Sequence, residues 1–203
     1  MNSDISVYPS IERLSELQQF ISNFSKIDRM LRMPGSARYE NDVDHSFGLA
    51  LTCWYLAPKI APELNLEKIF KYSLSHDIVE IYAGDTFIFD KADKLASKSD
   101  REDAALTQLS NDWPDFSDMV ESSRGYKNKI DQEAKFVKAV DKILPLLLVE
   151  LGEGEVFWNR HKITIDMMRQ NKITIKVSDH VEPYYEKILT WLDDRGNMHT
   201  SSE

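Results

Sequence analysis

Two of the five histidines lie in apolar stretches with helical spacing. His45 would share a helix face with Leu49 and Cys53, and His76 would share one with Tyr72 and Glu80. Because both histidines lie in apolar surroundings, both imidazoles are expected to point toward packed structure. Taken singly, such a histidine is more often a hydrogen-bonded core residue than a metal ligand, so the choice depends on what lies opposite it.

Asp141 is the acidic residue most out of place. It lies on the stripe that Val137, Leu144 and Leu148 form in the most apolar part of the chain. A buried carboxylate is costly unless a cation, a hydrogen-bonded partner or a metal compensates its charge. Pro145 cannot donate to the carbonyl of Asp141, so we expect the helix to kink there. An arginine partner and a metal both remain open for this carboxylate.

Asp77 directly follows His76 and adds a second carboxylate. Two imidazoles and two carboxylates form a mixed nitrogen and oxygen set, which suits Mn²⁺, Fe²⁺, Co²⁺, Ni²⁺, Mg²⁺ or Zn²⁺ with open positions for water. Such an ion can generate a hydroxide-like nucleophile near neutral pH and polarise a phosphoryl oxygen. These residues would therefore suit a divalent metal ion, whose identity they leave open.

The elements that would position these residues are helices. Glycine and proline are sparse, at seven each, and apolar residues recur at three- and four-residue steps rather than in alternation. This pattern predicts an all-α protein. The expected helices cover residues 10–24, 41–58, 66–82, 99–112, 115–123, 131–151, a short stretch after 164, and 178–192. The first would bury Ile11, Leu14, Leu17, Ile21 and Phe24; a capping box would join Ser99 to Glu102; Ser178 would cap the last helix.

Length and composition limit the function classes. At 203 residues and 23.5 kDa we expect a single domain over 1–203, with a core at about 10–151, C-terminal helices at about 155–195 and a frayed tail at 196–203. A net charge of −9 argues against nucleic-acid polymers, although local arginines could still bind a small phosphate ester. The single Cys53 excludes an internal disulfide and fits a cytoplasmic protein. We find no signal peptide and no apolar run long enough for a membrane span.

The ordered residues His45, His76-Asp77 and Asp141 resemble the H…HD…D signature of the HD-domain metal-dependent phosphohydrolases. The segment HDIVEIYAGD resembles the 5′-deoxynucleotidase-like branch of that family, as do RYENDVDHS and KFVKAVDKILPLL. The resemblance covers about residues 25–150. It implies an HD-domain helical bundle of about six or more helices, and a metal-dependent phosphohydrolase that removes phosphate from a small nucleotide such as a deoxynucleoside 5′-monophosphate.

The resemblance also implies roles for single residues. The ligands of one divalent ion would be His45, His76, Asp77 and Asp141. Glu80 would be the general acid or base that acts on the attacking water or the leaving oxygen. Asp85, after the flexible Gly84, would be a second residue of the reaction centre that recognises the sugar or supports the metal's surroundings.

The resemblance further implies a phosphate-binding arginine. Arg29, in KIDRMLRMPG, resembles the arginine that the family carries on its first helix. Arg32 could replace it, and Arg38 is a third candidate for substrate binding. An equally good interpretation places these arginines on a solvated face, paired with Asp28 or Glu40.

Other interpretations can be weighed on the same residues. Alarmone hydrolases carry two consecutive acids where this chain has Glu80 followed by Ile81, and cyclic-dinucleotide enzymes need further histidines. The remaining alternatives are a phosphatase or pyrophosphatase acting on another nucleotide or small phosphate ester, and a non-catalytic nucleotide-sensing module that a metal staples together. Glu80 favours an enzyme, because a structural metal site needs no general acid or base beside the ion. Aromatic residues on the last helix (Tyr184, Tyr185 and Trp191) would allow a homodimer.

Overall fold

The computed structural model describes residues 8–84, 97–170 and 175–200, and most of them are helical. The all-α prediction is confirmed. The helices are α1 (Ile11–Phe24), α2 (Asp42–Ile60), α3 (Leu66–Ser75), α4 (Glu80–Ala83), α6 (Lys98–Asp112), α7 (Ser117–Asn128), α8 (Gln132–Leu151), α9 (Glu155–Arg160), α10 (Ile165–Gln170) and α11 (Glu182–Arg195). One short antiparallel hairpin joins β1 (Asp28–Arg32) to β2 (Tyr39–Asn41). No helix in these three ranges is long and apolar enough to cross a bilayer.

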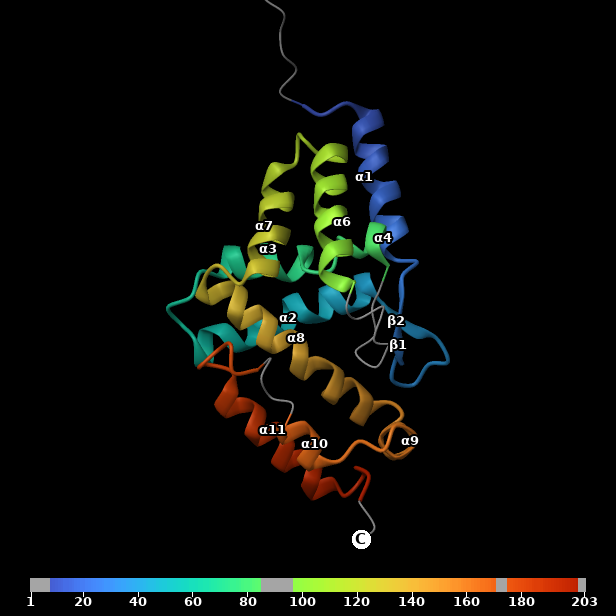
Figure 1. The fold of residues 1–203 in the computed structure, drawn as a ribbon, viewed down its shortest axis with the longest axis vertical. Helices are drawn as coiled ribbons and strands as arrows, with labels where there is room; N and C mark the ends of the chain where they lie inside the picture. Colours follow the sequence, from blue (N-terminus) through green and yellow to red (C-terminus); the bar gives the residue numbers. More distant parts are fainter. Residues whose placement is uncertain (1–7, 85–96, 171–174, 201–203) are drawn as a thin grey trace, which may run out of the picture.

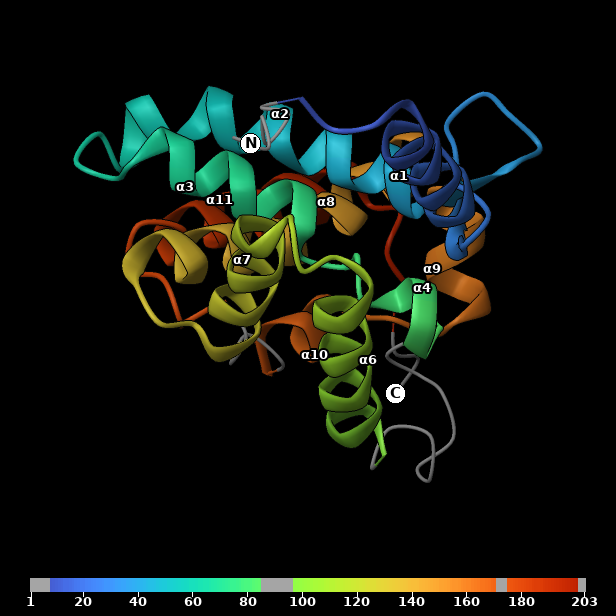
Figure 2. The ribbon, with the colours of Figure 1, turned by 90° about the horizontal axis from the view of Figure 1, so that it is seen from above.

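Helix α8 is the centre of the bundle. It crosses the middle of the molecule in Figure 1 and contacts α2, α3, α7, α11 and β1. The view from above in Figure 2 shows α2 and α3 along one side and α6 and α7 toward the other. Several apolar side chains of α8 are fully buried, namely Phe136, Val137, Val140 and Ile143, whereas Leu151 at its end is exposed. The helix remains continuous through Pro145.

Helix α2 begins at a capping box. The Asn41 side chain accepts from the N–H of Asp44 at 2.9 Å, and the Asp44 side chain accepts from the N–H of Asn41 at 3.3 Å. The inner face of the helix, with Leu49 and Cys53, is fully buried. This start therefore fixes the helical register in which His45 points inward.

The predicted helix over residues 66–82 is wrong in its second half. Helix α3 ends at Ser75, with His76 as its C-cap, and a separate short helix α4 begins at Glu80. Side chains take up carbonyls of the last turn: His76 Nδ1 lies 2.9 Å from Ser73 O, and Ser123 Oγ of α7 donates to Ser75 O at 2.9 Å. These contacts end the helix at the His76-Asp77 pair.

The expectation that Arg29 lies on the first helix is also wrong. Helix α1 ends at Phe24, and Arg29 lies on strand β1. The backbone N–H of Asp42 donates to Ile27 O at 3.1 Å. The hairpin thereby brings Arg29 to the start of α2.

Smaller expectations fail at helix ends and faces. Helix α6 begins at Lys98 without the capping box, and α11 begins at Glu182 because the carbonyl of Ser178 accepts from backbone N–H groups in a turn. Helix α1 buries Phe20 and Phe24, whereas Ile11, Leu14 and Ile21 of the predicted stripe are exposed. It is turned this way because Phe20 packs against Trp113, with ring centroids 5.1 Å apart.

The C-terminal segment is packed further than expected. Asn197 donates to the buried Glu150 of α8 at 2.7 Å, and Met198 is buried, so this part of the expected frayed tail is ordered against the bundle. Of the aromatic residues offered for a dimer, Tyr185 is buried and Trp191 is 38% exposed. Larger exposed apolar side chains lie on α2, namely Phe47, Leu51, Trp54 and Tyr55. A homodimer stays a prediction.

The N-cap of α8 provides a test of how α3 and α8 are held together. Asp131 accepts from the Ala134 N–H and the Tyr72 hydroxyl, both at 2.8 Å, and from Lys68 Nζ at 3.1 Å. We expect Asp131→Ala to lower the free energy of unfolding by about 1–3 kcal/mol, measured by urea denaturation. Glu121→Ala removes an exposed carboxylate from α7 and is the control. An equal effect in the two variants would contradict this role.

Candidate metal centre and phosphate site

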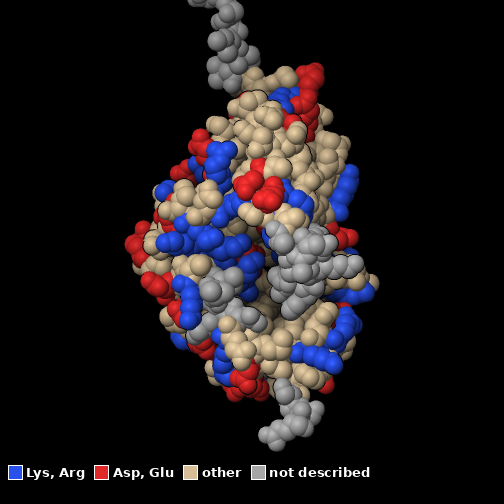
Figure 3. All heavy atoms as spheres, viewed as in Figure 1, with Lys and Arg blue, Asp and Glu red and all other residues tan. Residues whose placement is uncertain are grey.

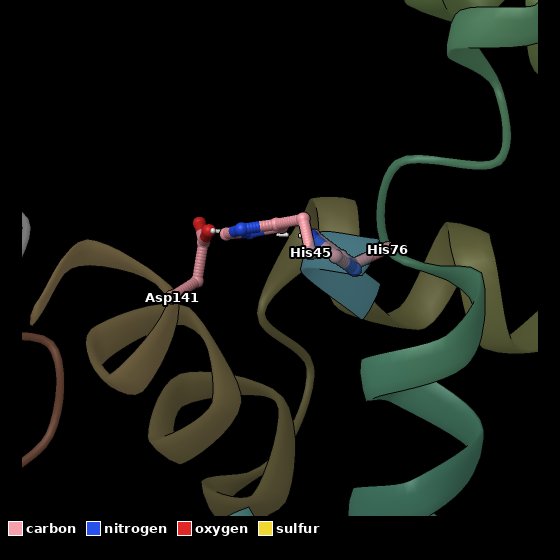
Figure 4. Close-up of side chains that lie close together, drawn as sticks. All are labelled: His45, His76 and Asp141. Atoms are coloured by element: carbon pink, nitrogen blue, oxygen red, sulfur yellow. Dashed lines mark hydrogen bonds and ion pairs between the residues drawn. The ribbon is translucent and has the colours of Figure 1, made fainter. Parts of the chain in front are cut away.

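Three buried side chains from three helical elements converge at one point. His45 comes from the first turn of α2, His76 from the end of α3 and Asp141 from the middle of α8 (Figure 4). Asp141 Oδ1 lies 3.0 Å from His45 Nε2 and 4.0 Å from His76 Nε2. The two imidazole rings lie 5.3 Å apart between centroids. Residues that are 31 to 96 positions apart in sequence thus face one another.

The tautomer of His76 is fixed by the backbone. Its Nδ1 lies 2.9 Å from Ser73 O, a carbonyl that only accepts, so Nδ1 carries the proton. Nε2 is then left to face carboxylate oxygens, with Asp77 Oδ2 3.0 Å away. An imidazole nitrogen that faces carboxylate oxygens needs positive charge between them, which either a proton on Nε2 or a metal ion supplies. His76 Nε2 is buried and makes no hydrogen bond within the described ranges.

His45 lies between two acids. Its Nδ1 is 3.4 Å from Glu40 Oε1, and its Nε2 faces Asp141. Burial alone would lower the pKa of His45, but the contacts with Asp141 and Glu40 outweigh burial and raise that pKa to about 9. The Glu40 contact orients the ring, so that Nε2 is the nitrogen presented to the centre.

The second carboxylate oxygen of Asp141, Oδ2, also has partners. Oδ2 accepts from the Tyr126 hydroxyl at 3.1 Å and pairs with Lys142 Nζ at 2.8 Å. Burial would raise the pKa of Asp141, but the charge of Lys142 and the contact with His45 hold it well below its usual range. The carboxylate therefore stays ionised, with Oδ1 directed at the imidazoles.

A second acidic group adjoins the first. Oxygens of Asp42, Asp77 and Glu80 all lie within 4.8 Å of one another. Arg29 Nη1 lies 2.8 Å from Asp77 Oδ2 and 3.2 Å from Asp42 Oδ1. Because Asp77 Oδ2 also lies beside His76 Nε2, Asp77 joins the two groups into one centre.

Burial affects Asp77 as it does Asp141. It would raise the pKa of the Asp77 carboxyl, but the charges of His76 and Arg29 hold that pKa well below its usual range. Both candidate carboxylate ligands are therefore ionised, which is the form that binds a metal ion.

The structure brings together six of the residues singled out from the sequence and separates two others. His45, His76, Asp77, Glu80, Asp141 and Arg29 form the centre. Arg32 instead pairs with Glu153 at 3.3 Å and donates to Ala37 O, and Arg38 pairs with Asp44. Both guanidinium groups have partners other than the acids that surround Arg29, and a substrate-binding role for Arg32 and Arg38 stays a prediction. Asp85 lies outside the described residues.

Several residues of the centre escape notice in the sequence. Asp42 and Glu40 lie in the segment before His45 and could have been found there by their acidity. Lys142 directly follows Asp141, and Lys138 precedes it by one helical turn. Nothing in the sequence singles out Tyr126, since its contact with Asp141 depends on how α7 packs on α8.

The donor set fits a divalent metal ion. In octahedral coordination, two adjacent donor atoms at about 2.1 Å from the ion are about 3.0 Å apart. His45 Nε2 and Asp141 Oδ1, and likewise His76 Nε2 and Asp77 Oδ2, have this spacing of 3.0 Å. Carboxylates outnumber cationic side chains around the centre, so a divalent ion would also reduce the excess of negative charge.

Comparisons with known proteins agree with this arrangement. A family model described as HD domain matches residues 25–182. A crystal structure from Magnetospirillum magnetotacticum MS-1, described as a predicted metal-dependent phosphohydrolase, is 27% identical with a TM-score of 0.76, and the match covers 93% of this chain and 96% of that one. A comparison with curated proteins found no match.

Two archaeal structures share the fold at lower identity. A conserved hypothetical protein from Pyrococcus furiosus is 20% identical with a TM-score of 0.55, covering 86% of this chain and 98% of that one. A protein from Pyrococcus horikoshii OT3 is 21% identical with a TM-score of 0.59, covering 87% and 98%.

The buried carboxylate of α8 provides a test of metal binding. Asp141→Asn keeps the size of the side chain and an acceptor for Tyr126, but removes the charge that a cation needs. We expect this variant to lose Mn²⁺ in elemental analysis after gel filtration. His180→Gln, which changes an imidazole paired with Glu63 at 2.9 Å, should retain the ion. Full Mn²⁺ occupancy in Asp141→Asn would remove Asp141 from the centre.

Proposed function

The chain belongs to the HD-domain family, and on that premise we propose that it is a metal-dependent phosphohydrolase that removes phosphate from a small nucleotide, specifically a deoxynucleoside 5′-monophosphate. One observation carries the proposal. His45, His76 and Asp141 are buried and bring potential ligand atoms within 4.8 Å of one another, while the acids Asp77 and Glu80 adjoin them.

The ligands of one divalent ion would be His45, His76, Asp77 and Asp141. When bound there, such an ion would lower the pKa of a coordinated water and polarise a phosphoryl oxygen. The rest of the centre supplies position and charge, which is most of what phosphoryl transfer requires of a protein. Glu40 and Ser73 orient the two imidazoles by holding their other ring nitrogens.

Glu80 is the proposed general acid or base. It begins α4 and is buried beside Asp77 and Asp42. A carboxylate adjoining a ligand can take a proton from the attacking water and return it to the leaving oxygen. The break between α3 and α4 places this side chain on a separate element, so its position does not follow the register of α3.

Arg29 is the proposed phosphate-orienting residue. Its guanidinium touches Asp77 and Asp42, so it lies at the edge of the centre and keeps an ionised form at every physiological pH. A substrate phosphate beside the ion would lie within reach of this planar donor group. Asp85 remains a proposed residue for recognition of the sugar.

The substrate class rests on two kinds of support. The relative from Magnetospirillum magnetotacticum supports a phosphohydrolase. The nucleotide rests on the segments around His45, His76 and Asp141 and on their resemblance to the 5′-deoxynucleotidase-like branch. A phosphate-release screen of purified protein over deoxynucleotides, ribonucleotides and simple phosphate esters, with each of several divalent metals, tests the proposal. Release from none of them would contradict it.

Glu80→Gln separates chemistry from metal binding. The amide has nearly the same shape but cannot accept the proton, so turnover should fall by about 10²–10⁴-fold. Metal content should equal that of the wild type. Steady-state kinetics with elemental analysis on the same sample make the measurement. Turnover close to the wild type would return Glu80 to a packing role.

Arg29→Ala tests phosphate orientation. Loss of a charge-assisted donor should lower kcat/KM by about tenfold or more, and Arg29→Lys should recover part of the loss. Arg38→Ala is the control, because that guanidinium pairs with Asp44 away from the centre. The proposal would be contradicted if Arg29→Ala had wild-type kinetics while Arg38→Ala was folded but inactive. The phosphate would then bind at Arg38.

A further inference from the structure

Two lysines of α8 direct their ammonium groups at the same carboxylate oxygen. Lys142 Nζ lies 2.8 Å and Lys138 Nζ 3.9 Å from Asp141 Oδ2. They are one helical turn apart, so their side chains lie next to each other on one face of the helix. Both side chains remain partly accessible to solvent, since the Lys138 side chain is 29% exposed and that of Lys142 is 34% exposed.

A single carboxylate, that of Asp141, contacts both lysines, and Asp77 adds negative charge without such a contact. Asp141 Oδ2 already accepts from Tyr126, and Asp141 Oδ1 faces the two imidazoles. In the proposed enzyme, a divalent ion would bind the same two carboxylates. Arg29 has the opposite surroundings, because Glu40, Asp42 and Asp77 all lie within 3.4 Å of its guanidinium.

Asp141 Oδ2 has its partners without Lys138. Lys142 and Tyr126 together satisfy Asp141 Oδ2. Lys138 adds a like charge beside Lys142, and its ammonium lies 4.8 Å from the centroid of the Tyr126 ring. Holding two like charges together in a partly buried place costs free energy unless an anion joins them.

We propose that Lys138 and Lys142 form a phosphate-binding subsite on the α8 side of the centre. The subsite takes the non-bridging oxygens of a phosphate monoester, whose dianion matches two ammonium groups in charge. Its ligand class rests on the proposed function. Arg29 approaches the centre from the acidic side and these lysines approach it from Asp141, so the phosphate lies between two cationic groups.

The surface supports an approach from this side. On the face shown in Figure 3, Lys and Arg atoms gather along one side of a hollow near the middle of the molecule, and α8 crosses the middle of the same face in Figure 1. The ammonium of Lys98, on α6, adds positive charge that acts on Lys138. A chain with a net charge of −9 thus presents a local basic edge to an anion.

The test measures phosphate binding directly. Inorganic phosphate is titrated into Mn²⁺-loaded protein by calorimetry, with metal content determined on the same sample. Lys138→Met keeps the length of the apolar stem and should weaken phosphate binding by about tenfold, with the metal fully retained. Lys138→Arg should restore most of the affinity. Lys59→Met is the matched control, since its ammonium lies over the Tyr55 ring on α2.

Kinetics separate this subsite from the function itself. Because the lysines would hold phosphate equally in the substrate and in the transition state, Lys138→Met should raise KM more than it lowers kcat. Wild-type phosphate affinity in the Lys138→Met, Lys142→Met double variant would overturn the subsite, even if phosphate esters are hydrolysed. Loss of Mn²⁺ in Lys138→Met would also overturn it. Lysine-dependent phosphate binding without any hydrolysis would support the subsite and contradict the proposed function.

Discussion

The buried charge of Asp141 is the constraint on which the rest of the structure depends. An ionised carboxylate buried in the central helix α8 costs several kcal/mol unless cations and donors surround it. Tyr126, Lys142 and the imidazoles of His45 and His76 meet that need, and each comes from a different element or turn. Packing of α2, α3 and α7 around α8 is therefore coupled to the assembly of the centre.

The local structure of each element serves this convergence. A capping box sets where α2 begins and so directs His45 inward. Side-chain contacts with carbonyls in the last turn of α3 end that helix at His76, which frees Asp77 and Glu80 from its register. The β1–β2 hairpin returns the chain so that Arg29 reaches the same acids.

Residue types and spacing were enough to predict the all-α fold, because apolar periodicity is local. They left the partners of His45, His76 and Asp141 open, and the joint site was predicted from the resemblance of the ordered H…HD…D residues to the HD family. Residue types and spacing were also not enough for the end of α3, which depends on a contact from Ser123 of α7. Arginine partners were equally out of reach, since a long flexible side chain pairs with whichever acid the fold brings near it. Arg32, for example, pairs with Glu153, which lies just after the end of α8.

The most direct test of a metal at the centre of this bundle is anomalous diffraction from crystals grown with Mn²⁺. The account predicts a strong anomalous peak within coordination distance of His45 Nε2, His76 Nε2 and Asp141 Oδ1, with Asp77 as the neighbouring carboxylate. Ordered crystals that show no peak there, with His45 and Asp141 instead in direct hydrogen-bonded contact at millimolar Mn²⁺, would contradict it.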